Sequence, residues 1–388
     1  MSTEAKSHSD KPIRLVVIED SPIQREALVD LFEEDGNLQV VAAVGTGKEG
    51  VERVKALKPD LVTCDIGLPD IDGFDVVRAI MADQPTPVIM LTATLRPKWR
   101  KDAFHALTLG AMDVIEKPDL ADLNDKEWRK RIQRQLRFIA RSPVIPHVLD
   151  RIKQRTDRLR AQAIERNDRT PTPTAIRVSP RPRQQTLSAT PTATIELLAV
   201  VASAGGPKAV RTLLEGLAPA FPLQVPILVA LHLGRHMGSS FASFLGQVLR
   251  APVVELLDQS TFEPGNIYVA PGRKHVEVVS KGRVRIFDQL PDSTYSPSLD
   301  YFLWSVARVY GPTAVGCILT GMGADGADGL LAMRRSGALT VGQDEASSLV
   351  YGMPRVAFEL GAVSVQQAPH EMPITICDWL GVRGKVRV

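Results

Sequence analysis

The sequence has 388 residues, a formal net charge of +3, and 44% hydrophobic against 23% charged residues. This composition is typical of a folded protein of about two domains and excludes the disordered and fibrous classes. The small net charge gives no support for nucleic acid as a partner. No apolar run reaches the roughly 18–20 residues of a membrane-spanning helix, and the polar residues 1–11 lack the apolar core of a secretory signal. Three widely spaced cysteines form neither a disulfide framework nor a metal motif, so we expect a cytoplasmic protein without membrane insertion.

The first part of the chain alternates short apolar runs with helical patterns. The runs predict parallel strands buried on both faces. They are Ile13–Ile18, Gln39–Val44, Leu61–Cys64, Pro87–Leu91 and Asp113–Ile115. The helical patterns are Pro22–Glu34, Gly47–Leu57, Phe74–Ala82, about Lys98–Leu109, and Asp125 to about Ala140. Five repeated β-α units imply right-handed crossovers, so residues 12–140 are predicted to form a doubly wound α/β domain.

Residues 141–194 have a different composition. They are basic, and from Thr170 onward they are rich in Pro, Thr and Arg with almost no large apolar residues. Such a segment cannot bury enough surface to order itself, which predicts a linker.

A second α/β domain is predicted over residues 195–388. Its expected strands are Leu197–Ala202, Pro226–Leu231, Asn266–Ala270, Val276–Val279, Val284–Phe287, Ala314–Leu319 and Ala338–Val341. Helical patterns separate most of them, and the pair around Lys281 and Gly282 predicts a β-hairpin. We therefore expect a second doubly wound fold with a mostly parallel sheet.

Acidic residues stand at two strand ends of the first domain. Glu19 and Asp20 follow the first strand and Asp65 closes the third. Carboxyl ends of parallel strands meet at one edge of a sheet, and three clustered carboxylates need a cation, for which Mg²⁺ suits oxygen ligands. Thr92 and Lys117 follow two further strands. A carboxylate, a divalent cation, a hydroxyl and an ammonium together predict an aspartyl-phosphate site.

The second domain opens with a strand that runs into a glycine turn, with Ser203 at the strand end. The turn presents a hydroxyl to the N–H groups of a helix N-terminus. Two other interpretations are a helix-capping serine and a nucleotide-phosphate turn, although the glycine and lysine pattern of the latter is absent. His232 and Asp325 follow two other strands, so that a Ser-His-Asp triad can assemble at one sheet edge, with His236 as an alternative base.

The first domain resembles the two-component receiver family. The resemblance is carried by ED (19–20), D-x-x-L-P-D-x-D-G (65–73), LTA (91–93) and EKP (116–118), and covers about residues 13–140. It implies phosphorylation of Asp65 by a sensor histidine kinase, with Mg²⁺ held by Glu19, Asp20 and Asp65.

The second domain is similar to the catalytic domain of the chemotaxis protein-glutamate methylesterases. The motifs are ASAGGP (202–207), YVAPGRKHV (268–276), SPSLD (296–300), ILTGMGADGADG (318–329) and QDEASSLVYGMPR (343–355). The resemblance implies Ser203 as nucleophile, His232 as base and Asp325 as its orienting group. It also implies Ala204 and Met322 as supports of the oxyanion. The chain departs from the family pattern at Val201, Ala204 and Tyr295.

Together the two resemblances imply an enzyme in which phosphorylation activates hydrolysis of glutamate methyl esters, and deamidation of glutamine, on the cytoplasmic domains of methylated chemoreceptors. The esterase chemistry is expected to need no cofactor. Two alternatives stay open: a receiver-regulated hydrolase of another ester or amide, and a catalytically weak adaptor that responds to phosphorylation.

Overall fold

The structure, a computed structural model, describes residues 11–34, 36–92, 103–118, 123–141, 191, 193–291, 293 and 295–382. The predicted linker lies outside these ranges except at its two ends. No helix in the described part is long and apolar enough to cross a membrane.

The N-terminal domain is a receiver fold with a parallel five-stranded sheet in the order β2-β1-β3-β4-β5. The strands are β1 (Ile13–Ile18), β2 (Leu38–Val44), β3 (Leu61–Asp65), β4 (Val88–Thr92) and β5 (Asp113–Glu116). The helices are α1 (Pro22–Glu33), α2 (Gly47–Leu57), α3 (Gly73–Asp83) and α6 (Lys126–Ala140), together with the 3₁₀ helix η1 (Ala103–Leu109). The predicted doubly wound fold is confirmed.

Both faces of this sheet are buried, which explains why its strands read as continuous apolar runs. Alternate residues of β1 point to opposite faces. Leu15 and Val17 pack in the core formed with α1 and α6. Val16 and Ile18 pack in the core formed with α2, α3 and η1.

The C-terminal domain is built on a seven-stranded parallel sheet in the order β14-β13-β12-β6-β7-β9-β8. The strands are β6 (Leu197–Ala202), β7 (Ile227–Leu231), β8 (Val253–Glu255), β9 (Ile267–Val269), β12 (Ala314–Ile318), β13 (Leu339–Gln343) and β14 (Val365–Gln367). The order reverses beside β6, and a switch point of this kind is where open α/β sheets place their sites.

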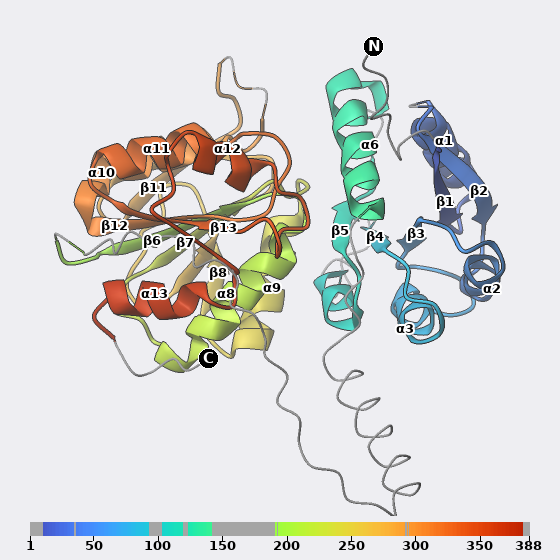
Figure 1. Cartoon of the computed structure of the whole chain (residues 1–388), viewed down its shortest axis with the longest axis horizontal. Coiled ribbons are helices and arrows are strands. Elements are labelled where there is room, and N and C mark those ends of the chain that lie inside the picture. Colours follow the sequence, from blue (N-terminus) through green and yellow to red (C-terminus); the bar gives the residue numbers. More distant parts are fainter. Residues whose placement is uncertain are drawn as a thin grey trace, which may run out of the picture.

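Helices cover both faces of the large sheet (Figure 1). One layer holds α8 (Gly206–Leu217), α9 (Met237–Leu249) and α13 (Met372–Trp379). The other layer holds α10 (Leu299–Tyr310), α11 (Ala327–Arg335) and α12 (Met353–Glu359), and the short 3₁₀ turns η2 (Ala218–Ala220) and η3 (Gly311–Thr313) complete the domain.

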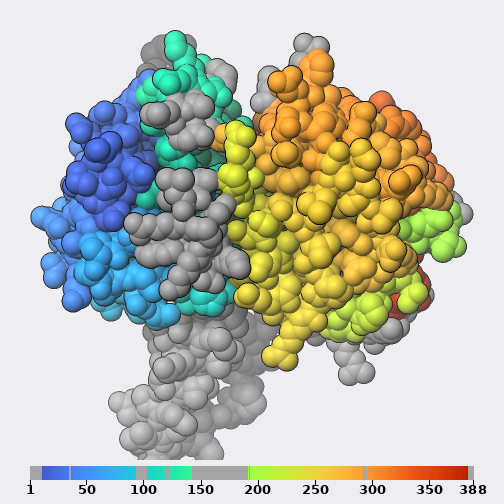
Figure 2. All heavy atoms as spheres, turned by 180° about the vertical axis from the view of Figure 1, so that it is seen from behind, coloured from blue at the N-terminus to red at the C-terminus, as the bar shows by residue number. Residues whose placement is uncertain are grey.

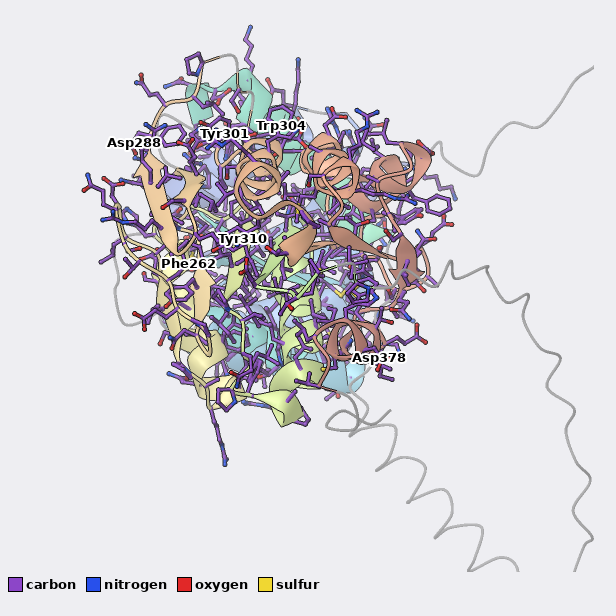
Figure 3. The ribbon with its side chains drawn as sticks, turned by 90° about the vertical axis from the view of Figure 1, so that its left-hand side faces the viewer. Phe262, Asp288, Tyr301, Trp304, Tyr310 and Asp378 are labelled. Carbon is purple, nitrogen blue, oxygen red and sulfur yellow. The ribbon has the colours of Figure 1, made fainter. Side chains whose placement is uncertain are left out.

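The predicted hairpin is confirmed as a separate antiparallel pair, β10 (His275–Ser280) with β11 (Arg283–Phe287). It packs beside α10. Phe262 and Tyr310, labelled in Figure 3, lie there with ring centroids 6.4 Å apart.

Three elements differ from the sequence expectation. The helix expected around Lys98–Leu109 is, in its described part, the 3₁₀ helix η1, which ends just before Gly110 at φ 110°. Strands β8 and β14 were not predicted. Both are short edge strands that are only partly buried, so they do not form an apolar run in the sequence, whereas β9, which is equally short, is buried throughout.

The two domains are docked on each other. In Figure 1 the receiver presents β5 and α6 to the C-terminal domain, and Figure 2 shows the two domains from behind. Phe104 of η1 packs against Phe241 and Phe244 of α9, with ring centroids 4.9 and 6.0 Å apart. This apolar contact merges one receiver core with the core of the C-terminal domain.

Candidate functional site

Ser203 stands where β6 ends and the chain turns into α8. The turn closes because Gly205 takes φ 72°, a left-handed conformation that glycine adopts without strain. The Thr320 carbonyl, just after neighbouring β12, accepts the Ser203 N–H at 3.0 Å. A Cβ at Gly321 would come within 2.8 Å of the Ser203 Cβ, so that glycine lets the two loops meet.

His232 connects Ser203 and Asp325. Its Nδ1 lies 3.0 Å from Ser203 Oγ and its Nε2 lies 2.8 Å from Asp325 Oδ2. The structure therefore brings the three predicted residues into one hydrogen-bonded line. The alternative base, His236, lies instead at the start of α9.

Asp325 is almost fully buried and is held from several sides. Its carboxylate accepts the N–H groups of Leu299 and Asp300 at 2.8 and 3.0 Å, at the first turn of α10. Burial acts to raise the pKa of Asp325, but the His232 contact and these two amides outweigh it. The pKa of Asp325 is thus lowered, and the residue stays charged beside the imidazole.

Two further predicted residues border the space in front of Ser203. Ala204 and Met322, both predicted supports of an oxyanion, line the same cavity as Ser203 and His232. Within the described residues neither of their N–H groups has a hydrogen-bond acceptor. Such donors are what a developing negative charge requires.

The receiver covers this cavity. Its lining combines residues of β5 and α6 with the site residues of the C-terminal domain, and its volume is about 90 Å³. Pockets that take ligands usually have roughly 300–1,000 Å³. In the docked arrangement the receiver therefore leaves little room in front of the triad for a side chain of another protein.

Asp113 of β5 makes a polar contact across this interface. Its Oδ2 accepts the Gly205 N–H at 2.9 Å, two residues after Ser203, and the Gln135 side chain at 3.0 Å. Burial raises the pKa of Asp113 to about 6, although these hydrogen bonds lower it.

We expect docking to depend on pH through Asp113. An exposed aspartate has a pKa of 3.8, so the docked form binds a proton more tightly between about pH 4 and 6. Docking should weaken as the pH rises through this window. The pKa of Asp113 thus differs by about 2 between the docked and the exposed carboxyl, which limits the pH-dependent change in the docking free energy to about 3 kcal/mol. Energy transfer between fluorophores on the two domains measures the docked fraction at each pH. The Asp113→Asn variant should lose the dependence of docking on pH. Identical pH profiles for both proteins would contradict this prediction.

The predicted phosphoacceptor residues also converge. Lys117 Nζ lies 2.7 Å from Glu19 Oε2 and 2.9 Å from Asp65 Oδ2, and all three side chains are buried. Burial raises the pKa of Glu19, against the lowering effect of Lys117. Thr92 Oγ1 is buried and, among the described residues, has no hydrogen-bond partner.

The same site fits a divalent cation. Carboxylate oxygens of Glu19, Asp20 and Asp65 lie within 4.8 Å of one another. An all-oxygen set of this kind is the ligand chemistry that Mg²⁺ prefers. Because Lys117 supplies one positive charge against three carboxylates, a cation would complete the neutralisation.

Sequence reasoning missed three residues that complete the sites. Asp300 Oδ1 accepts the N–H groups of Gly326 and Gly329 and so fixes the loop of Asp325. Its only signal was its place in SPSLD. Tyr295 was singled out only as a departure from the family pattern, and its contact with His232 was not foreseen. It stacks on His232, with ring centroids 5.3 Å apart and an interplanar angle of 6°. Asp113 was placed in a strand, and nothing local marked it as an interdomain contact.

Comparisons with known proteins find relatives of both parts of the chain. The family model of the CheB methylesterase matches residues 198–376, and that of the response regulator receiver domain matches residues 15–126. A protein-glutamate methylesterase/protein-glutamine glutaminase of Anaeromyxobacter dehalogenans is 36% identical over 94% of this chain and 96% of its own length. Its counterpart from Caulobacter vibrioides is 35% identical over 96% and 99%. The CheB methylesterase catalytic domain of Thermotoga maritima, a crystal structure, is 26% identical with a TM-score of 0.44, and covers 48% of this chain and 99% of its own.

Proposed function

The chain belongs to the family of CheB methylesterases that carry a receiver domain, and on that premise we propose that it hydrolyses glutamyl methyl esters on methylated chemoreceptors. The observation that carries this proposal is the line from Ser203 through His232 to Asp325, with contacts of 3.0 and 2.8 Å. Its biological output is sensory adaptation in chemotaxis.

Catalysis begins with Ser203. His232 Nδ1 takes the hydroxyl proton as Oγ attacks the ester carbonyl, which requires that the resting imidazole carries its proton on Nε2, toward Asp325. Asp325 selects that tautomer and stabilises the imidazolium. The N–H groups of Ala204 and Met322 receive the oxyanion, and each such donor contributes about 10²–10³-fold in rate.

The intermediate then collapses. His232 returns its proton to the leaving methoxide, methanol departs, and a glutamyl ester remains on Ser203. Water, deprotonated by the same imidazole, attacks this ester and releases the glutamate carboxylate and free Ser203. With glutamine the leaving group is ammonia, so the same residues deamidate it.

Regulation follows from the small cavity that the receiver covers. The unphosphorylated receiver holds β5 and α6 over the triad, and a phosphoryl group on Asp65 shifts the equilibrium toward an undocked form. Lys117, 2.9 Å from Asp65, adjoins Glu116, whose side chain packs against Gly234 close to His232. A displacement of Lys117 toward a phosphoryl group therefore acts on the interface through the next residue.

Phosphorylation itself depends on the carboxylate cluster. A sensor histidine kinase supplies the phosphoryl group, and Glu19, Asp20 and Asp65 would hold Mg²⁺. The cation supplies charge neutralisation for the phosphoryl oxygens. Thr92 donates its hydroxyl to one of these oxygens, and Lys117 pairs with another.

Methanol release from a methylated chemoreceptor cytoplasmic fragment tests the proposal. Wild type and Ser203→Ala are compared, each with and without a phosphodonor and Mg²⁺. We expect release that rises on phosphorylation and disappears in the variant.

Two other results would contradict the proposal in different ways. Wild-type hydrolysis of generic acyl esters, with none of the receptor fragment, would favour a hydrolase of another substrate. Phosphorylation of Asp65 without any Ser203-dependent hydrolysis would favour the adaptor.

The switch is tested separately by Asp65→Asn. We expect this variant to keep the basal rate and to lose activation by the phosphodonor, because it removes the phosphoacceptor while keeping the side-chain shape. Asp60→Asn, at an exposed aspartate directly before β3, is the matched control. Activation that survives in Asp65→Asn would place the phosphoryl group elsewhere.

A further inference from the structure

Hydrogen bonds hold the imidazole of His232 at both ring nitrogens. They lie at the edge of the ring and do not restrain its two faces. Nδ1 meets Ser203 and Nε2 meets Asp325. Two contacts fix a line across the ring, and the ring can still tilt about that line. A contact against a face restrains this tilt and so helps to keep the Nδ1 lone pair aimed at Oγ.

Tyr295 supplies this contact. Its ring lies almost parallel to the imidazole, at 6°, with 5.3 Å between the centroids. It also lines the cavity that holds Ser203. The aromatic ring is therefore part of the wall of the site.

The Tyr295 ring is itself held in place. Ser293 Oγ donates to the Tyr295 carbonyl at 2.7 Å and accepts the Tyr295 N–H at 3.3 Å. The phenol oxygen lies against the loop that carries Asp325, since a Cβ at Gly323 would come within 2.9 Å of it. Tyr295 thus bridges the imidazole and the loop of its carboxylate partner.

The stacked ring also has an electrostatic consequence. The face of a tyrosine ring carries negative potential and attracts a cation within about 6 Å of its centroid. The imidazole becomes a cation only as it accepts the Ser203 proton. An attraction that arises only in the transition state raises kcat and leaves KM almost unchanged.

We propose that Tyr295 is a positioning residue that aligns the His232 ring and stabilises its protonated form during attack by Ser203. The inference rests on the proposed function of the triad. It adds a fourth side chain, from the loop before α10, to the three at the strand ends.

The test uses the full chain, phosphorylated in the presence of Mg²⁺, with methanol release as the readout. Tyr295→Phe keeps the ring and should stay within about twofold of wild type. Tyr295→Leu removes the ring and should lower kcat about 10-fold at nearly unchanged KM. Tyr301→Leu is the control, because Tyr301 contacts Phe287 (ring centroids 5.7 Å apart) rather than His232.

A series of fluorinated phenylalanines at position 295 separates charge stabilisation from packing. Fluorine withdraws electron density from the ring face with little change of shape, so kcat should fall stepwise with each added fluorine. Equal kcat across the series, or equal kcat for the Phe and Leu variants, would overturn the inference while the proposed function stands. No Ser203-dependent release from wild type would overturn both.

Discussion

Replacing Asp325 by asparagine is expected to lower kcat by about 10⁴-fold. In the wild type, Oδ2 accepts both the Leu299 N–H and His232 Nε2, while Oδ1 accepts the Asp300 N–H. An asparagine has only one acceptor oxygen. Its amide nitrogen must therefore face N–H donors on one side, where it cannot accept a hydrogen bond. It also carries no charge to stabilise the imidazolium.

The same carboxylate contributes to folding. Its pKa is lowered in the folded protein, so its stabilising effect is fully present above the usual value of 3.8 and is lost as the pH falls through the lower folded-state value. Asp325→Asn should therefore reduce the melting temperature at pH 7 by more than at acid pH.

Single-turnover kinetics and thermal melts of the phosphorylated chain measure both effects. Asp328→Asn is the matched control, since Asp328 is an exposed aspartate of the first turn of α11. A loss below 10-fold in Asp325→Asn would mean that another group orients His232.

Much of both folds could be predicted because their strands are buried on both faces. A run such as that of β6 is apolar throughout, and the first polar residue after it marks the sheet edge. Ser203, His232 and Asp65 were found at such edges without knowledge of the strand order. Short strands such as β8 lacked this signal.

Contacts between distant segments could not be predicted in the same way. Asp113 stands in a strand of the receiver, and its partner Gly205 follows 92 positions later. The stacking of Tyr295 on His232 depends on the path of a loop that has no periodic pattern. These contacts depend on how the two domains and their loops pack, which local sequence does not encode.

The docked arrangement itself gives the other large expected effect. A Cβ at Gly234 would collide with Glu116 of the receiver and would lie 2.6 Å from its Cβ. All three of the nearest atoms belong to that one side chain. Gly234→Ala therefore disturbs the interface more than the C-terminal domain. We expect basal hydrolysis by the unphosphorylated chain to rise about 10-fold or more. A 10-fold rise corresponds to about 1.4 kcal/mol lost from the free energy of docking.

A second substitution tests whether steric exclusion of the receiver is the cause. Glu116→Gly removes the three atoms nearest to the new methyl group. In the double variant Glu116→Gly with Gly234→Ala, the receiver should therefore inhibit basal hydrolysis more strongly than in Gly234→Ala alone, and Glu116→Gly alone is the control. The rate of phosphorylated Gly234→Ala should stay near that of phosphorylated wild type, because the undocked form is already dominant there. If Gly234→Ala instead lowered both rates equally, the alanine would be acting on His232 and its loop. The covering of the triad by the receiver would then not be what limits basal activity.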